Sequence, residues 1–338
     1  MFFQRFLKKL LTLNNWLIIS SSVVLIFVST VIMRFIEPET FPTYFDSFWW
    51  VMTTVTTVGY GDFYPVSILG RLYAVFLYLF GIGFIGVVIG KVVEGFAQFR
   101  LKQEEGKMSY LDKNHVVIIG WSKKAHYALL EILEADSKIE IVLISMLEKT
   151  PIQHDRVHFI HGDATDDIIL NKANIKYSRS VIIFADDTIK DSQLSDGKSL
   201  LIATSIERLA GDLHITVEIQ VEKHIELFKH VSVDEFIISD EMISKMAAQS
   251  VLARGVTNIY SQLMSRKLGD DLYQIPTNPK WTTYRDAFHD LLEQGATLIS
   301  NGENLNINRR LDEAIDVHSK LYIICNEETY KKIVGNEH

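Results

Sequence analysis

The sequence predicts a helical membrane part followed by a soluble α/β part built on a doubly wound parallel sheet. Two hydrophobic segments near the N-terminus are long enough to cross a bilayer, and short apolar strands spaced by helical stretches follow them. The charges divide in the same way: residues 1–113 carry 10 basic and 8 acidic side chains, whereas the remainder carries 24 and 34. An acidic soluble part argues against nucleic acid as a partner, because phosphate neutralisation needs clustered Lys and Arg.

The membrane part is predicted to span the bilayer twice, over residues 16–36 and 72–95. Basic residues precede the first span and follow the second, so the positive-inside bias places both termini in the cytoplasm. Residues 1–15 mix Phe and Leu with Lys and Arg, as a helix on the inner membrane surface does, although a basic tail fits the same composition. No small-residue cleavage site follows the first span, so we expect a multi-pass protein held in the bilayer.

The stretch between the spans, residues 44–62, is too apolar for a solvated loop and too short to cross the membrane and return as two helices. A re-entrant segment is the alternative, with a short helix capped by Asp46 or Ser47 and an irregular return. Irregular backbone survives at membrane depth only where it lines a polar cavity or is buried in protein. Gly59 and Gly61 permit the backbone angles that point successive carbonyls to one side.

The pentapeptide TVGYG in this return segment resembles the selectivity filter of potassium channels. The resemblance implies that carbonyl oxygens, with the hydroxyl of the first residue, replace the hydration shell of K⁺. It also implies a homotetramer, because two spans and one loop cannot enclose a pore alone. The expected filter residues are Thr57, Val58, Gly59, Tyr60 and Gly61, with K⁺ held at the first four, and the side chains of Val58 and Tyr60 are expected to pack outward.

The second span contains FGIGFIG, in which Gly83 matches the position where related channels bend their inner helix. Close helix packing by small residues is the alternative role of this glycine. Residues 96–113 turn polar and are predicted to form a linker.

The soluble part begins with a Rossmann-like domain at residues 114–239, where apolar strands alternate with helical stretches. Residues 240–268 are predicted to form amphipathic connecting and dimerisation helices, and residues 269–338 a small α/β lobe. The single cysteine, Cys325, lies in the apolar run LYIIC, so we expect a buried structural thiol in a reducing compartment.

The dinucleotide fingerprint G-x-G-x-x-G is broken in this domain, because its three positions hold Gly120, Ser122 and Ala125. The second strand also lacks a terminal acid for a ribose. The usual mode of NAD binding is therefore disfavoured. Another ligand at the same strand ends stays open, since open parallel sheets bind ligands there.

The order of pore, linker, Rossmann-like domain and small lobe resembles bacterial potassium channels with a regulator of K⁺ conductance (RCK) domain, similar to TrkA-N and TrkA-C. The resemblance implies a cell-membrane channel whose RCK domains pair into an octameric ring, and whose inner helices are opened by a ligand. Ligands in the family include Ca²⁺ and other divalent cations, adenine nucleotides, NAD and a cyclic dinucleotide. The identity of the ligand stays open.

Seven residues near the predicted strand ends are candidate ligand contacts. Some of them have an alternative, purely structural role. Asp163 can equally be a cap or turn residue, and the acids from Asp186 onward can form a solvated loop that includes Asp191 and Asp196. A calcium site used by one relative is in doubt here, because Phe184 and Gln220 replace two of its acids. The candidates are Gly120, Trp121, Ser122, Asp163, Asp186, Asp187 and Glu218.

Further alternatives concern the products of the gene and the class of protein. Glu104, Glu105 and Gly106 precede Met108, and their codons can spell a ribosome-binding sequence, so a soluble form starting at Met108 is one expectation.

A component of a K⁺ uptake system and a membrane-anchored nucleotide-binding regulator are the rivals to a channel. An enzyme is not expected, since no nucleophile with a positioned base is evident.

Overall fold

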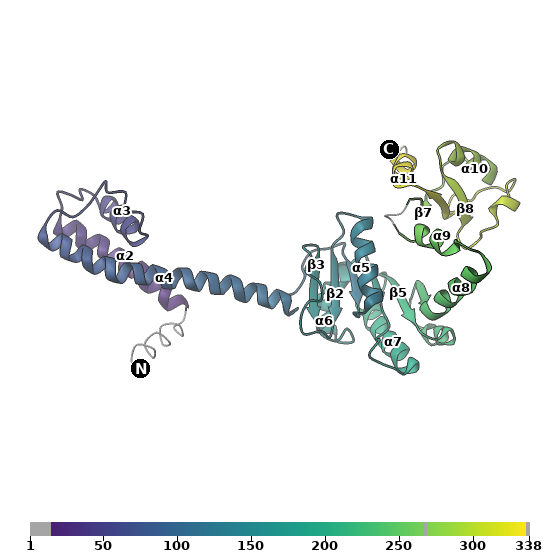
Figure 1. Cartoon of the computed structure of the whole chain (residues 1–338), viewed down its shortest axis with the longest axis horizontal. Coiled ribbons are helices and arrows are strands. Elements are labelled where there is room, and N and C mark those ends of the chain that lie inside the picture. The colour runs from purple at the N-terminus through teal and green to yellow at the C-terminus, as the bar shows by residue number, and fades with distance from the viewer. Residues whose placement is uncertain (1–14, 266–268, 336–338) are drawn as a thin grey trace. The chain divides into compact units, whose positions relative to one another are not determined.

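The computed structural model describes residues 15–265 and 269–335, and the chain divides into two compact units, Met1–Lys102 and Gln103–His338 (Figure 1). The interfacial helix predicted for residues 1–15 lies outside the described residues except for Asn15, where α2 begins.

The first unit consists of three helices, α2 (Asn15–Ile36), α3 (Tyr44–Val55) and α4 (Ile68–Glu104). Buried apolar side chains from all three form its core, including Met33, Trp50 and Leu77. Helix α4 has 37 residues and continues through positions 96–104, which the sequence had assigned to the linker. It continues because this stretch contains no proline or glycine and is rich in good helix formers.

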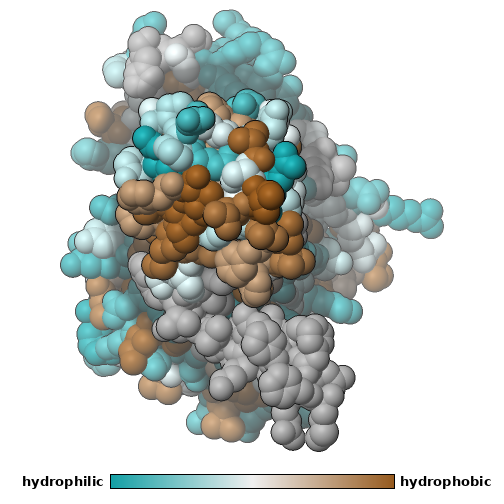
Figure 2. Space-filling view, turned by 90° about the vertical axis from the view of Figure 1, so that its left-hand side faces the viewer, coloured by the Kyte–Doolittle hydropathy of each residue, from teal (hydrophilic) through white to brown (hydrophobic). Residues whose placement is uncertain are grey.

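The surface of the first unit is strongly apolar, and Figure 2 shows hydrophobic side chains gathered in a broad brown patch on the face that it views. Exposed side chains include Phe27, Leu72 and Leu79, at 68%, 63% and 72% exposure. Among the described residues α4 is long and apolar enough to cross a membrane, and Ser20–Ile36 of α2 forms a shorter apolar helix. Such a surface is suited to lipid or to further helices.

The start of α3 is set by a capping box between Thr43 and Asp46. The Thr43 hydroxyl accepts a hydrogen bond from the Asp46 amide at 3.2 Å, and the Asp46 carboxylate accepts one from the Thr43 amide at 2.9 Å. The expectation that Asp46 or Ser47 caps this helix is therefore wrong. Thr43 has the extended backbone that a cap requires, whereas the other two already lie inside the helix.

A buried glutamate joins the end of α2 to the start of α4. Glu37 is 5% exposed, and its carboxylate accepts hydrogen bonds from the Val66 amide at 2.9 Å, the Ser67 amide at 2.7 Å and the Ser67 hydroxyl at 2.6 Å. A carboxylate at a helix N-terminus is also favoured by the helix dipole. Glu37 therefore fixes the chain that leaves the re-entrant segment.

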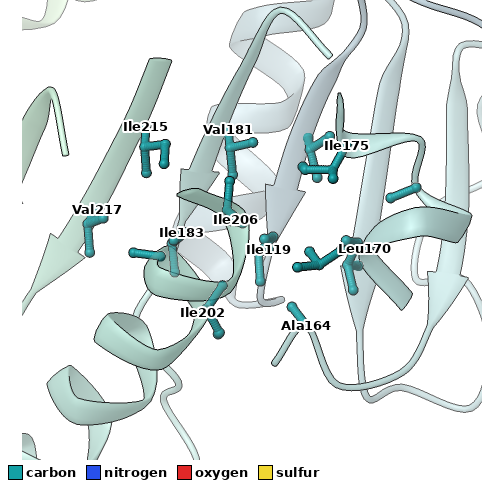
Figure 3. Close-up of a cluster of buried hydrophobic side chains, with 14 of the residues drawn as sticks. Ile119, Ala164, Leu170, Ile175, Val181, Ile183, Ile202, Ile206, Ile215 and Val217 are labelled. Carbon is teal, nitrogen blue, oxygen red and sulfur yellow. The ribbon is translucent and has the colours of Figure 1, made fainter. Parts of the chain in front are cut away.

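The second unit is built on a six-stranded parallel sheet of order β3-β2-β1-β4-β5-β6, the doubly wound arrangement predicted from the sequence. Its hydrophobic core, part of which Figure 3 shows, gathers strand residues such as Ile119 and Ile183 with Ile202 and Ile206 of α7. The strands are β1 (Val116–Ile119), β2 (Ile141–Ser145), β3 (Val157–His161), β4 (Ser180–Ile183), β5 (His214–Ile219) and β6 (Glu235–Ile238). The helices are α5 (Lys123–Ala135), α6 (Asp167–Lys172) and α7 (Ser192–Leu209), with short 3₁₀ turns η1 (Ile175–Tyr177) and η2 (Glu222–Phe228).

The amphipathic stretch after the sheet forms two helices, α8 (Ser239–Leu252) and α9 (Val256–Leu263). The break falls at Gly255, whose φ of +85° is left-handed and ends the helical path. The small lobe follows as an antiparallel sheet of order β7-β9-β8. Its elements are β7 (Asp271–Ile275), α10 (Tyr284–Glu293), β8 (Thr297–Asn301), η3 (Ile307–Arg309), β9 (Leu321–Cys325) and α11 (Glu327–Gly335), and the Cys325 thiol is buried as predicted.

We predict that Glu37→Gln lowers the stability of the first unit by about 1–3 kcal/mol, because an amide replaces a carboxylate that accepts three hydrogen bonds. Thermal melting of the purified protein in detergent measures the effect. The matched control is Glu39→Gln, which changes an exposed glutamate two residues away. Equal melting temperatures for the two variants would contradict the role of Glu37.

Candidate functional site

The backbone of the TVGYG segment has a positive φ at every second residue. Thr57, Gly59 and Gly61 have φ of +63°, +55° and +75°. The amides of Val58 and Gly59 both donate to the Thr53 carbonyl, at 2.9 and 3.0 Å. Because each peptide group is planar and trans, the carbonyls of Thr57 and Val58 point away from α3. The segment can therefore present carbonyl oxygens on one side.

The Tyr60 side chain of this segment makes an aromatic contact with α3. The ring of Tyr60 stacks on Trp49 of α3, with centroids 5.7 Å apart and planes 2° apart. The Trp49 indole donates a hydrogen bond to the Asp62 carboxylate at 2.8 Å. Trp49 thus contacts residues on both sides of Gly61 and supports the return segment from α3.

The glycines of α4 differ in their surroundings. A Cβ on Gly81 would lie 2.9 Å from a methyl of Val55 at the end of α3, so this glycine permits close packing. Gly83 has nothing within 4 Å of its Cβ position, and α4 runs through it without interruption. The hinge role of Gly83 stays a prediction.

A pocket of about 440 Å³ lies at the carboxyl ends of β1 to β4 in the second unit. This edge includes the switch point between β1 and β4, where open α/β sheets bind ligands. Its volume falls within the range of pockets that hold small organic molecules. The lining combines apolar walls with polar groups: Ile119, Gly120, Trp121, Ile144, Ser145, Met146, Leu147, Gly162, Asp163, Ala164, Phe184, Asp186, Thr188, Ser195, Lys198, Ser199 and Ile202.

Four of the seven candidate ligand residues line this pocket: Gly120, Trp121, Asp163 and Asp186. Gly120 has a φ of +91°, and a Cβ there would lie 3.0 Å from the Phe184 carbonyl, so its position requires glycine. It immediately precedes the turn into α5, whose N-terminal amides favour an anion.

The two acids of the pocket already have internal partners. Asp163 Oδ1 accepts hydrogen bonds from the amide and hydroxyl of Thr165, both at 3.0 Å, so this residue is a turn residue that also lines the pocket. Asp186 accepts bonds from the Thr188 hydroxyl at 2.6 Å and from Lys198 Nζ at 2.9 Å. Burial alone raises the pKa of the Asp186 carboxyl, but these bonds outweigh it and the pKa lies below its ordinary value.

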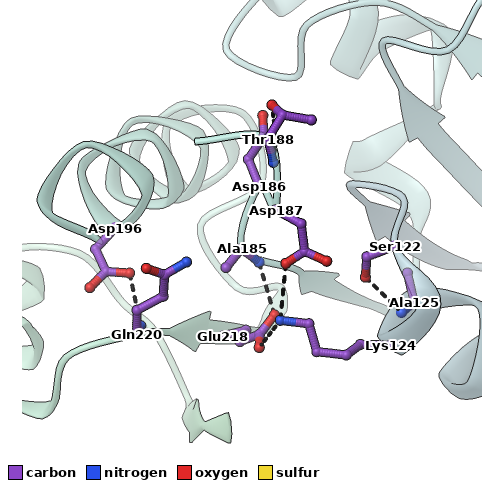
Figure 4. A network of polar contacts seen from close by, with 10 residues as sticks. All are labelled: Ser122, Lys124, Ala125, Ala185, Asp186, Asp187, Thr188, Asp196, Glu218 and Gln220. Carbon is purple, nitrogen blue, oxygen red and sulfur yellow. Dashed lines mark hydrogen bonds and ion pairs between the residues drawn. The ribbon is translucent and has the colours of Figure 1, made fainter. Parts of the chain in front are cut away.

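The other three candidates, Ser122, Asp187 and Glu218, belong to a polar network outside the pocket lining (Figure 4). Ser122 caps α5 by accepting from the Ala125 amide at 3.2 Å. Glu218 is 1% exposed and accepts bonds from Lys124 Nζ at 2.7 Å and the Ala185 amide at 3.0 Å.

Lys124 is the centre of this network, because its ammonium also lies 3.3 Å from Asp187 Oδ1. Burial lowers the pKa of the Lys124 ammonium, but the bonds to Glu218 and Asp187 outweigh it and the pKa lies above its ordinary value. The ammonium therefore occupies the position between two carboxylates that a bound cation would need. Within the described parts of the chain, no group of three or more His, Cys, Asp or Glu side chains is arranged to hold a metal ion.

Of the two further acids that the sequence placed in a possible solvated loop, Asp191 is exposed and Asp196 is buried. Asp191 caps α7 by accepting from the amides of Gln193 and Leu194, at 2.9 and 3.1 Å. Asp196 is fully buried and accepts from the Gln220 amide at 2.9 Å and from His224 Nδ1 at 2.6 Å. Both are structural because the fold brings donors to them.

Sequence reasoning missed the face of α7 that enters the pocket lining. Ser195, Lys198, Ser199 and Ile202 all line the pocket, at the i, i+3, i+4, i+7 spacing of one helix face. The Ser195 hydroxyl is buried and has no hydrogen-bond partner. A polar atom left unpaired at a pocket wall favours a ligand that supplies its partner. The i, i+3, i+4, i+7 spacing was the sequence signal that could have predicted this pocket wall. The same spacing is also found on an ordinary helix face that packs against a core.

The carbonyl-presenting return segment and the ligand pocket together define a membrane channel with a regulatory domain. Family comparisons agree with this class. Residues 21–98 match the ion channel family, and residues 116–239 match the TrkA-N domain. The chain therefore joins an ion channel domain to a TrkA-N domain, and its homologues are potassium channels with RCK domains.

Individual relatives support the same assignment. The chain is 28% identical over 271 residues to YugO of Bacillus subtilis, which is named as a potassium channel protein, covering 79% of this chain and 82% of that protein. It is 29% identical over 224 residues to the calcium-gated potassium channel TvoK of Thermoplasma volcanium, covering 66% of this chain and 64% of that protein. These homologues are potassium channels, which are not enzymes, in agreement with the prediction.

One solved structure has a fold similar to that of this chain. The human SLO3 gating ring is similar with a TM-score of 0.51 and 14% identity, over 66% of this chain and 46% of that chain. At this identity the likeness concerns the fold alone.

We predict that Lys124→Met lowers stability by about 1–3 kcal/mol, because Glu218 is left buried without its cation. We also expect Ca²⁺ to raise the melting temperature of this variant and not that of the unaltered protein, since a cation can then replace the ammonium. The control is Lys123→Met, which removes one positive charge from the exposed lysine next to Lys124. Calcium stabilisation of the unaltered protein to the same degree would contradict the role of Lys124.

Proposed function

We propose that this protein forms a K⁺-selective pore as a homotetramer in the bacterial cell membrane, with both termini in the cytoplasm, and that a ligand bound to its RCK domain gates the pore. The observation that carries the proposal is the backbone from Thr57 to Gly61, whose φ angles alternate while the Val58 and Gly59 amides are bonded to α3. Carbonyls on the opposite side can then replace the hydration shell of K⁺. Thr57, Val58, Gly59 and Tyr60 supply these oxygens.

A nucleotide is the ligand class that the pocket of the second unit supports best. The pocket is large enough for one nucleotide, and its apolar walls include Trp121 and Phe184, which suit a planar base. The N-terminus of α5 beside Gly120 suits a phosphate group. The unpaired Ser195 hydroxyl supports the presence of a further polar group on the ligand.

A divalent cation alone is a weaker candidate at the Glu218 position. Lys124 already neutralises Glu218 and Asp187, and a cation would have to displace its bonded ammonium. TvoK, by contrast, is named as calcium-gated.

Assembly of the RCK domains into a ring, eight to a ring, is supported by the surfaces of α8 and α9. Among the described residues these two helices bury no side chain, and they expose Ile243, Val251, Leu252 and Ile259 at 58–85%. A second copy of the same helices is the partner that we propose, because a symmetric pair covers both apolar faces. A soluble form starting at Met108 would supply extra copies for this ring.

Two other functions remain as alternatives. A component of a K⁺ uptake system would use the same regulatory domain, and a membrane-anchored nucleotide-binding regulator would use only the pocket. Both predict that the purified protein by itself conducts no K⁺, which separates them from a channel.

For the filter, we predict that Gly59→Ala abolishes K⁺-selective flux. A φ of +55° costs an alanine about 1–2 kcal/mol, hence about 4–8 kcal/mol over the four chains of a pore. The measurement is K⁺ or Tl⁺ flux into liposomes, with Na⁺ flux for comparison. Gly95→Ala, at an open position of α4, should keep the selectivity. Equal Na⁺ and K⁺ flux through the unaltered protein would exclude the proposed filter.

For the pocket, we predict that Ser195→Ala leaves stability unchanged or raises it, because the hydroxyl has no partner to lose. Nucleotide affinity should fall about tenfold, which corresponds to about 1.4 kcal/mol. Calorimetric titration with AMP, ADP and ATP, together with thermal melting, measures both effects. Ser192→Ala, outside the pocket lining, is the control. Unchanged affinity for every nucleotide that binds would remove Ser195 from the site.

A further inference from the structure

The chain that leaves α4 is bonded directly to the Rossmann-like sheet at its edge strand. We call residues 104–110 the docking segment. The carbonyl of Glu104, the last residue of α4, accepts from the Thr150 amide at 2.8 Å, and the Gly106 carbonyl accepts from the His161 amide at 3.1 Å. Further along, the Tyr110 amide donates to the Lys172 carbonyl at 2.8 Å. The segment is therefore bonded to the loop after β2, to β3 and to the end of α6.

Gly106 both ends the helix and permits the close contact with β3. Its φ of +63° is the left-handed angle typical of the residue after a helix, and its amide donates to the Gln103 carbonyl at 3.1 Å. A Cβ on Gly106 would lie 2.3 Å from the His161 amide nitrogen and 2.9 Å from the Ile160 carbonyl carbon. Backbone atoms cannot move aside as a flexible side chain can. Any larger residue must therefore displace the segment from β3.

His161 connects this contact to the wall of the pocket. It is the last residue of β3, and Gly162, Asp163 and Ala164, which follow it, all line the pocket. Its ring Nδ1 donates to the Leu147 carbonyl at 2.7 Å, and Leu147 also lines the pocket. One residue thus bonds to the docking segment through its backbone and to the pocket wall through its side chain.

We infer that Gly106 and His161 form the joint through which an occupied pocket acts on α4. The inference rests on the proposed ligand gating and adds the residues that transmit it. A ligand that shifts the chain at Asp163 or Leu147 changes the position of His161, and the tight contact with Gly106 passes that change to the end of α4. A flexible linker would absorb such a displacement, whereas a backbone contact that excludes even a methyl group transmits it.

The test compares nucleotide binding with nucleotide-dependent flux in full-length protein. AMP, ADP and ATP serve as probes, with binding measured by calorimetry and K⁺ flux measured in liposomes. Coupling between two sites typically amounts to about 5- to 150-fold. We expect Gly106→Ala to bring the flux ratio with and without nucleotide to about one, while the dissociation constant stays within about threefold.

Two further variants distinguish a loss of coupling from misfolding or from backbone strain at the new alanine. His161→Ala keeps the amide that bonds to Gly106 but loses the ring bond to Leu147, so it should reduce the flux ratio without removing the docking. Gly302→Ala introduces an alanine at a similar φ, +54°, where nothing lies within 4 Å, and should behave as the unaltered protein.

The outcomes separate the joint from the function on which it rests. A normal flux ratio in both Gly106→Ala and His161→Ala, with nucleotide still bound, would overturn the joint and leave the ligand-gated channel intact. If no nucleotide changes flux through the unaltered protein, the proposed gating fails and the joint fails with it. Loss of the flux ratio together with loss of nucleotide binding would also overturn the joint, because it would place Gly106 in the binding site.

Discussion

The pore unit depends on one constraint, that backbone polar groups at membrane depth need partners. The Thr53 carbonyl at the end of α3 meets this constraint for two consecutive amides, those of Val58 and Gly59. Once these amides are bonded on one side, the planar peptide groups leave their carbonyls on the other. Glu37 and Trp49 then hold the ends of the segment, through the Ser67 and Asp62 contacts. The carbonyl arrangement that the proposed filter needs therefore follows from how α3 is placed.

The regulatory unit separates its charges into two sites with different uses. Beside the sheet, Lys124 binds Glu218 and Asp187, so three charged groups satisfy one another and need no added ion. In the pocket, the acids are also bonded internally, but the Ser195 hydroxyl is left unpaired. A buried network that is complete is costly to open, whereas an unpaired group at a pocket wall is stabilised by a ligand. This difference is why we propose the pocket, and not the acidic network, as the regulatory site.

The sequence by itself determined the classes of structure, because these depend on local patterns. Apolar length predicted spans at 16–36 and 72–95, which lie within α2 and α4, and the spacing of apolar strands predicted a doubly wound parallel sheet. Gly59 and Gly61 were identified because an unusual backbone angle calls for glycine, and Gly120 because it holds the first position of the dinucleotide fingerprint; all three have positive φ. Such signals are carried by single residues or short repeats, so they can be read without knowing the fold.

Only the tertiary structure decided which residues share a site. Ser122, Asp187 and Glu218 looked like ligand residues, yet Lys124, 94 positions before Glu218 in the chain, pairs with two of them outside the pocket. Asp191 and Asp196 looked solvated, yet one caps α7 and the other is buried against the chain after β5. Gly106 belongs to the predicted linker, yet its backbone packs against the backbone of His161. In each case the deciding partner is distant in the sequence, and no local pattern records a contact that only folding creates.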